Sequence, residues 1–167
     1  MKVNLDKILD HKAIAHKTRR IAYQIYESNA DEKEVVLAGI ADNGFKFAQR
    51  LEIVLKEIAP FAITLCEVKM NKVNPLNTIT TSLQPADYRN KSIVLIDDVL
   101  NSGTTLIYGV QHFLQVPLKR FKTAVLVNRN HKKYPVKADF KGISLSTSLN
   151  ESVKVRFRKG SDMAILE

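Results

Sequence analysis

The chain has almost no cysteine and no long apolar run. Cys66 is its one cysteine, which excludes an intramolecular disulfide and disfavours a cysteine-based metal site. The longest apolar stretches, such as residues 35–40 and 124–127, are much shorter than the roughly 18 residues that span a bilayer. Residues 1–6 lack the apolar core of a secretory signal. We therefore expect a cytoplasmic protein with no membrane span.

The composition is that of an ordinary globular protein. Hydrophobic residues make up 45% of the 167 residues and charged residues 26%. There is no internal repeat, low-complexity tract or linker, so we expect a single domain over residues 1–167. The net charge of +9 attracts anions, which include both small phosphorylated substrates and nucleic acids. Charge alone does not separate these two kinds of partner.

Apolar runs of strand length alternate with segments of helical period. Residues 35–40, 61–67, 92–96 and 121–127 are predicted strands, and residues 10–29, 45–55 and 104–114 are predicted helices, the first capped by Asp10. This alternation predicts an α/β fold with an open, mainly parallel twisted sheet flanked by helices. Ligands of such sheets bind at the carboxyl ends of the strands, so the loops after Ile40, Ile96 and Val127 should converge.

One segment carries the chemistry, because a buried strand leads directly into two acids and a loop rich in hydroxyls. Asp97 and Asp98 can accept hydrogen bonds from vicinal hydroxyls and face a divalent cation. Gly103 allows close approach of a phosphate to a helix N-terminus, where unpaired N–H groups favour anions. The residues expected to bind a 5-phosphate are Asn101, Ser102, Gly103, Thr104 and Thr105. The alternative is that the acids only cap a turn and the loop only starts a helix.

Residues 93–105 resemble the signature with which type I phosphoribosyltransferases bind phosphoribosyl pyrophosphate (PRPP). Further runs, at residues 8–10, 20–22, 37–40, 124–131 and 135–142, are similar to the pyrimidine-operon regulator/uracil phosphoribosyltransferase family. This resemblance covers nearly the whole chain. It implies a small hood built from parts of residues 1–12 and 128–167, a homodimer or larger assembly, and Mg²⁺ as cofactor.

The resemblance also implies roles for individual residues. It assigns catalysis to Asp97, Asp98 and Asn101, and metal binding to Asp97, Asp98 and Asp139. It assigns stacking on the base to Phe140, and the residues it assigns to pyrophosphate are Ala41, Asp42, Asn43, Gly44 and Arg129, the first two often joined by a cis peptide.

Each of these roles has a plainer alternative. Residues 41–44 can form an ordinary strand-to-helix turn, and Arg129 with His131 can belong to a surface turn. Phe140 can be a core residue. Asn43 also departs from the family, which usually carries a basic residue at this position, so pyrophosphate binding is expected to be weaker.

The polar segment from residue 70 to residue 91 has no clear periodicity and is predicted to be a long loop. By resemblance, residues 70–85 are the mobile loop that closes over PRPP. Lys69 and Lys72 are the cations nearby that can meet pyrophosphate, although exposure without a function is the alternative for both.

Asn101 bears on the choice of base. Purine-using relatives carry a carboxylate three residues after the acidic pair, and an amide cannot act as a general base in the required pKa range. The sequence therefore favours a transferase that uses PRPP and uracil. Three alternatives stay open: a purine-base phosphoribosyltransferase, an RNA-binding regulator of pyrimidine genes that senses nucleotides, and a nucleotide-binding protein that has lost catalysis.

Overall fold

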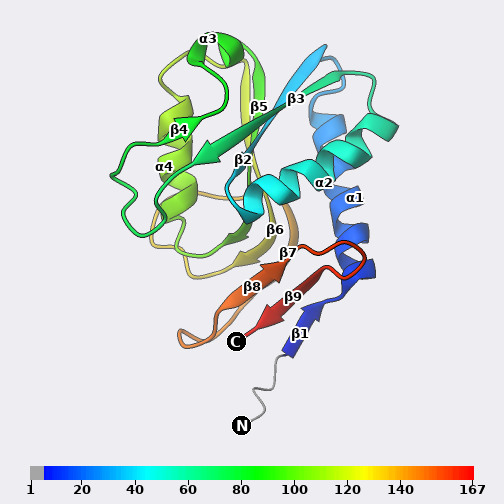
Figure 1. The fold of residues 1–167 in the computed structure, drawn as a ribbon, viewed down its shortest axis with the longest axis vertical. Helices are drawn as coiled ribbons and strands as arrows, with labels where there is room; N and C mark the ends of the chain where they lie inside the picture. The colour runs from blue at the N-terminus through cyan, green and yellow to red at the C-terminus, as the bar shows by residue number, and fades with distance from the viewer. Residues whose placement is uncertain (1–5) are drawn as a thin grey trace.

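The structure, a computed structural model, describes residues 6–167 and has a six-stranded sheet at its centre (Figure 1). The strands of this sheet are β2 (Glu34–Ile40), β3 (Ala62–Lys69), β4 (Thr80–Thr81), β5 (Ser92–Leu100), β6 (Arg120–Arg129) and β7 (Phe140–Leu145). Their order is β4-β3-β2-β5-β6-β7, and all neighbours are parallel except the β3–β4 pair. The predicted open, mainly parallel sheet is confirmed.

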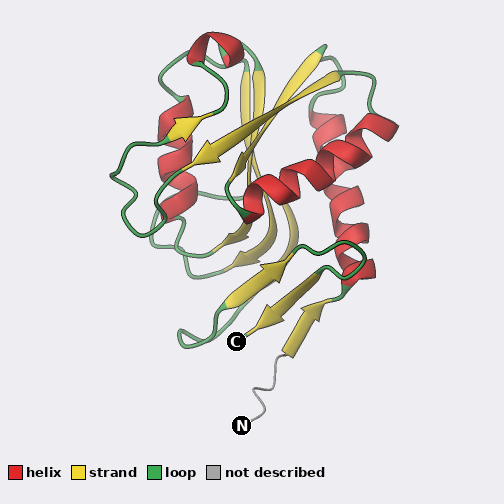
Figure 2. Ribbon diagram, viewed as in Figure 1, coloured by secondary structure: helices red, strands yellow, loops and turns green. Residues whose placement is uncertain are grey.

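Helices cover both faces of the sheet (Figure 2). Helices α1 (His11–Ser28) and α2 (Asn43–Ile58) lie on one face, and α4 (Thr104–Phe113) lies on the other, with the short helix α3 (Pro85–Tyr88) above it. Asp10 caps α1 as predicted, since its side chain accepts a hydrogen bond from the N–H of Ala13 at 2.8 Å. None of the described helices is long and apolar enough to cross a membrane.

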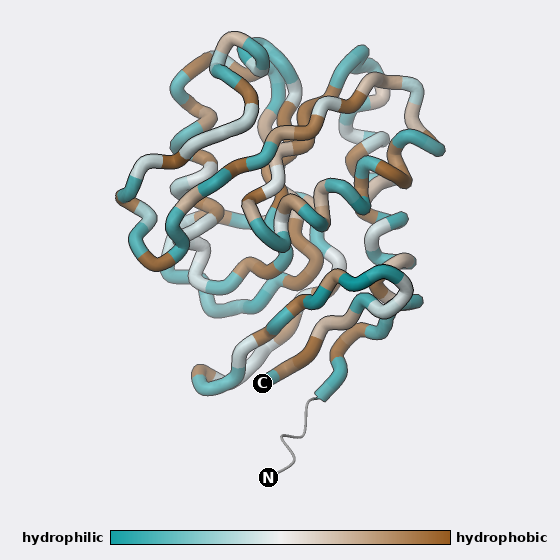
Figure 3. Tube along the Cα trace, viewed as in Figure 1, coloured by the Kyte–Doolittle hydropathy of each residue, from teal (hydrophilic) through white to brown (hydrophobic). Residues whose placement is uncertain are grey.

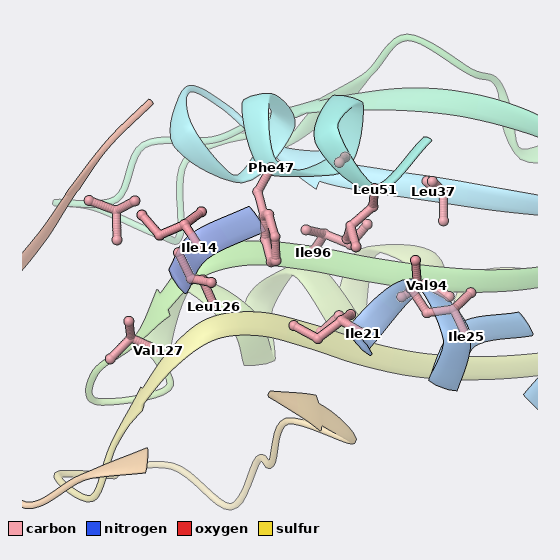
Figure 4. Close-up of a cluster of buried hydrophobic side chains, with 14 of the residues drawn as sticks. Ile14, Ile21, Ile25, Leu37, Phe47, Leu51, Val94, Ile96, Leu126 and Val127 are labelled. Atoms are coloured by element: carbon pink, nitrogen blue, oxygen red, sulfur yellow. The ribbon is translucent and has the colours of Figure 1, made fainter. Parts of the chain in front are cut away.

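Burial on both faces explains why the central strands are almost entirely apolar. Side chains of α1 and α2 pack against alternate residues of β2, β5 and β6, as Figure 4 shows for Ile21, Phe47 and Ile96. The intervening strand residues pack against α4 in a second cluster that includes Leu95, Leu106 and Phe113. In Figure 3 these strands are the brown segments at the centre of the molecule, while the connecting loops are largely teal.

A second, three-stranded antiparallel sheet forms the predicted hood. It consists of β1 (Asp6–Leu9), β9 (Met163–Leu166) and β8 (Val153–Arg156), in that order. Any contribution from residues 1–5 lies outside the described part of the chain. Figure 1 places this sheet beyond one end of the main sheet, and β8 contacts β5.

One face of α2 holds the hood in place. Asn43 donates from Nδ2 to the carbonyl of Val155 at 2.8 Å, and the rings of Phe47 and Phe157 stack with centroids 6.0 Å apart. Farther along, Arg50 donates to the buried carboxylate of Asp162 at 2.9 Å. The hood is therefore fixed to the helix that follows β2.

Two predicted boundaries are wrong in ways that matter for the site. Strand β5 does not end at Ile96 but continues to Leu100, so the acidic pair belongs to the strand and not to the loop after it. Asp97 and Leu100 still pair with Val125 and Asn128 of β6, which prolongs the ladder. The segment from residue 70 to residue 91 is not only loop, because it contains β4 and α3.

Candidate active site

The carboxyl ends of β2, β5 and β6 lie side by side, because β5 stands between the other two. The loop after β2 packs directly on the acidic pair. A Cβ at Gly44 would lie 2.7 Å from the carbonyl oxygen of Ile96 and 3.0 Å from Cα of Asp97, so only glycine allows this approach. The peptide bond between Ala41 and Asp42 is cis. The structure therefore brings residues 41–44 and Asp97 together.

Asp97 is buried, although the sequence predicts that both acids face a diol and a divalent cation. The residue is 4% exposed, and Oδ1 accepts a hydrogen bond from the N–H of Asp98 at 2.9 Å. Nζ of Lys72 lies 3.3 Å from the same oxygen. The pattern of an apolar strand followed by two acids did not reveal the burial, because β5 continues past them. Asp97 nevertheless lines a pocket of about 40 Å³ together with residues 101–105.

The pKa of Asp97 is raised from 3.8 to about 8, mainly by burial and then by the charge of Asp98, while the charge of Lys72 opposes the shift. The folded protein thus keeps this proton at pH values where the unfolded chain has lost it. The free energy of unfolding should therefore fall as the pH rises from 3.8 to about 8.

Asp97→Asn removes this titration, so we expect the variant to be more stable than the wild type by about 2 kcal/mol at pH 8.5 and nearly equal to it at pH 4. Thermal melting in EDTA across this pH range measures the difference. Parallel pH profiles for the two proteins would contradict the assigned burial.

Asp98 is half-buried and is held by the first residue of α2. Nδ2 of Asn43 donates to Oδ2 of Asp98 at 3.1 Å, and the N–H of Val99 donates to Oδ1 at 2.9 Å. Since the same Asn43 amide also holds the carbonyl of Val155, it joins the acidic pair to the hood.

The loop before α4 has the features of an anion site. Gly103 adopts φ +87°, which favours glycine, and its Cβ position lies 2.6 Å from Cγ1 of Val136. The hydroxyls of Ser102 and Thr104 lie 2.8 Å apart, and the amide of Thr104 donates to Ser102 Oγ at 3.3 Å. Within residues 6–167, the amides of Ser102, Gly103 and Thr105 have no protein acceptor. These N–H groups remain able to bind a phosphate.

Arg129 does not have a free guanidinium for pyrophosphate, contrary to the role predicted for it. The residue is 8% exposed, and it donates to Thr147 Oγ1 and to Asn101 Oδ1, both at 2.9 Å. It also donates to the backbone carbonyls of Ser148 and Glu151. This side chain therefore holds the segment between β7 and β8, and His131 supports it by a contact with the carbonyl of Thr147.

Asp139 and Phe140 are not brought to the acidic pair. The carboxylate of Asp139 accepts from the N–H of Thr123 at 2.9 Å and lies 3.5 Å from Nζ of Lys137, so its contacts are structural. Phe140 packs against the core on the face that α1 and α2 cover, whereas Asp97 shares a pocket with the start of α4. The core alternative therefore describes Phe140, and Asp139 is no metal ligand in this arrangement.

Of the two lysines beside residues 70–85, Lys72 reaches the site and Lys69 ends β3 in an exposed position. The sequence did not single out the residues that bind Arg129, namely Thr147, Ser148 and Glu151. No pattern marks them, because two of the three contribute only backbone carbonyls.

Few side chains at the site could bind a metal ion. Among residues 6–167 there is no cluster of three or more His, Cys, Asp or Glu side chains that could hold a metal ion. Asp97 and Asp98 supply carboxylate oxygens, which suit Mg²⁺ when phosphate oxygens and water complete its shell. The site therefore fits a cation that arrives with a phosphorylated ligand and does not fit a cation held by protein alone.

Comparison with known proteins identifies the family of this arrangement. The model of the phosphoribosyl transferase domain matches residues 4–157. The chain is 31% identical to the bifunctional protein PyrR of Pediococcus pentosaceus, over 96% of this chain and 98% of that protein. It is 32% identical to the bifunctional protein PyrR of Chloroflexus aurantiacus, over 93% of this chain and 90% of that protein.

Solved structures agree at the level of the fold. A hypoxanthine-guanine phosphoribosyltransferase of Bacillus anthracis superposes with a TM-score of 0.76 over 95% of this chain and 96% of that chain, at 17% identity. The resemblance seen in residues 93–105 thus extends over the whole architecture. The chain belongs to the phosphoribosyl transferase domain family.

Proposed function

We propose that this phosphoribosyltransferase transfers ribose 5-phosphate from PRPP to a nucleobase, with uracil as the favoured base, and releases pyrophosphate. The observation that carries the proposal is the shared pocket of Asp97 and residues 101–105 at the end of β5. It sets the carboxylate of Asp97, which can accept from a diol, beside amides and hydroxyls that can hold a phosphate.

In this reaction a ring nitrogen of the base bonds to C1 of the ribose while the bond from C1 to pyrophosphate breaks, and the proton of that nitrogen passes to solvent or to the departing pyrophosphate. Asp97 and Asp98 accept hydrogen bonds from the two ribose hydroxyls, and residues 102–105 bind the 5-phosphate. Pyrophosphate leaves toward the backbone of residues 41–44, next to Asp97. Mg²⁺, bound through the acidic pair and the phosphates, would neutralise the charge of the leaving group.

Lys72 supports a role for the segment between β3 and β4 in the reaction. Its ammonium group lies 3.3 Å from Oδ1 of Asp97. Binding of the ribose and the cation at the acids would release Lys72 toward the pyrophosphate. The segment would then cover the site and exclude water.

A panel of uracil, hypoxanthine, guanine, adenine and cytosine, each incubated with PRPP and Mg²⁺, tests this proposal through pyrophosphate release. We expect release with uracil and at least about tenfold less with the others, since each hydrogen bond that a wrong base fails to make costs about 1 kcal/mol or more. Pyrophosphate release with hypoxanthine or guanine alone would show that the substrate is a purine base and not uracil. If no base leads to pyrophosphate release, the transfer reaction is refuted.

A second candidate function is RNA binding, and the net charge of +9 favours it. It is compatible with the first, as is a homodimer or larger assembly. Binding that weakens steeply with salt and depends on the nucleotide present would support this regulatory role. A protein that binds nucleotides but releases no pyrophosphate would instead have lost catalysis.

A further inference from the structure

The two longest stretches of the chain without a lysine, arginine, aspartate or glutamate are residues 73–86 and residues 99–118. Such residues make up 26% of the whole chain, so a surface built from these two stretches is unusually poor in charge. The first stretch belongs to the segment that joins β3 to β5, and the second includes the whole of α4. The structure places them side by side (Figure 1), and residues 75–79 line a hollow of about 580 Å³ together with side chains of residues 108–115.

Helix α4 has the composition of a helix that is covered on both sides. A helix that faces solvent on one side normally carries charged residues there. The inner side of α4 packs on the sheet through Leu106 and Phe113. Its outer side carries no charged residue, and Ile107 and Tyr108 line a second hollow of about 410 Å³ there, next to Tyr134. The outer side therefore lacks the residues that favour contact with water.

Large apolar side chains protrude from the same surface. Six of them are exposed within residues 6–167, and three of the six, Val73, Leu76 and Leu114, belong to the two uncharged stretches. Val73 is 95% exposed, Leu76 79% and Leu114 61%. Protruding apolar groups beside uncharged hollows are typical of a surface that another molecule covers.

We propose that this uncharged face, formed by residues 73–79, residues 107–115 and Tyr134, binds the same face of a second copy of the chain. Each copy carries a net charge of +9, so two copies repel each other and approach at least cost where neither presents charge. Burial lowers the pKa of His112, which keeps this residue of the face neutral at pH 7. The inference does not depend on the proposed transfer reaction.

The lack of charge also argues against other kinds of partner. A nucleic acid binds through lysine and arginine side chains that contact its phosphates, and the uncharged face has none. An acidic protein would be attracted to the basic residues elsewhere on the surface. A second copy with the same charge is the partner that the uncharged face suits.

The uncharged face is complementary to itself in shape as well. In a dimer with twofold symmetry the same patch is used twice, so it must contain both the groups that protrude and the hollows that receive them. Here Val73 and Leu114 protrude, and the two hollows lie between residues 75–79 and the outer side of α4. The face thus provides both halves of such an interface.

The interface would cover the segment that carries Lys72. Oδ1 of Asn71 accepts hydrogen bonds from the N–H groups of Val73 and Asn74, both at 2.9 Å. This turn joins Lys72, which lies on Asp97, to the uncharged face. A second copy that buries Val73 would therefore hold the segment in one conformation, and dimerisation is expected to protect its backbone.

Sedimentation velocity of the full chain over a range of protein concentrations tests the interface. We expect a dimer for the wild type. Leu76→Asp and Leu114→Asp should each raise the dissociation constant at least about a hundredfold, because each dimer would bury two unpaired carboxylates. Both leucines are exposed in the single chain, so the variants should keep the circular dichroism spectrum of the wild type.

Leu149→Asp is the matched control, because it makes the same change at a leucine that is 89% exposed and lies outside the uncharged face. It should leave the dissociation constant unchanged. A wild type that stays monomeric at every concentration would overturn the proposal. So would dimers of Leu76→Asp and Leu114→Asp as stable as those of the wild type, or an equal loss for Leu149→Asp.

Hydrogen exchange followed by mass spectrometry locates the contact. Residues 73–79 should exchange at least about tenfold more slowly in the wild type than in monomeric Leu114→Asp, and Leu149→Asp should behave as the wild type. A dimer that slows exchange only in other parts of the chain would be built on another face and would refute the inference. RNA that slows exchange of residues 73–79 in Leu114→Asp would assign the face to nucleic acid instead.

Discussion

Replacing both Asp97 and Asp98 by asparagine is expected to lower pyrophosphate release about a thousandfold, because the transition state loses the carboxylates that hold the ribose hydroxyls and the cation. The amides keep the shape of the side chains but remove both negative charges. Initial rates at saturating PRPP and Mg²⁺ give the effect.

This loss should occur without loss of the fold. Asp97 is buried and its pKa is raised by burial, so an amide at this position removes a cost of folding at neutral and higher pH. The double variant should therefore melt at or above the wild-type temperature. Asp31→Asn with Glu57→Gln removes the same charge from exposed positions and should retain the wild-type rate. A wild-type rate for the variant with Asp97→Asn and Asp98→Asn would show that these acids have no part in the mechanism.

The second large effect is expected from Gly103→Val, which should weaken PRPP binding by about a hundredfold or more. Gly103 has φ +87°, and its Cβ would lie 2.6 Å from Cγ1 of Val136, so the loop must shift to accept any side chain. That shift would move the amides of residues 102–105 away from the phosphate. We also expect a loss of about 1 to 3 kcal/mol in the free energy of unfolding.

Gly160 provides the control for backbone strain. It has φ +73°, but no heavy atom lies within 4 Å of its Cβ position. Gly160→Val should therefore lose comparable stability from the backbone and keep its affinity for PRPP. Calorimetry below the melting temperature of both variants makes the comparison. Equal affinities for Gly103→Val and the wild type would mean that the phosphate does not bind at this loop.

The sequence predicted the sheet because its strands are buried on both faces. Strands such as β2 and β6 carry runs of apolar residues that only a two-sided core explains. The acidic pair and the phosphate loop were also recognisable, since all their groups lie within residues 97–105 and need no distant partner to be understood.

The sequence could not predict contacts between residues distant in the chain. Whether Arg129 is free for a ligand depends on acceptors 18 to 22 residues later, and two of them are backbone carbonyls with no sequence signature. Asp139 was predicted to bind a metal, but in the structure its carboxylate accepts a hydrogen bond from the N–H of Thr123. The burial of Asp97 likewise follows from the extra length of β5 and from the approach of Gly44, which no local pattern announces.

A crystal structure of the protein with PRPP and Mg²⁺ tests the central claim most directly. We predict the two ribose hydroxyls about 3 Å from the carboxylates of Asp97 and Asp98, and the 5-phosphate on the amides of residues 102–105. A ribose bound elsewhere, with Lys72 still on Asp97 and the amides before α4 empty, would contradict it.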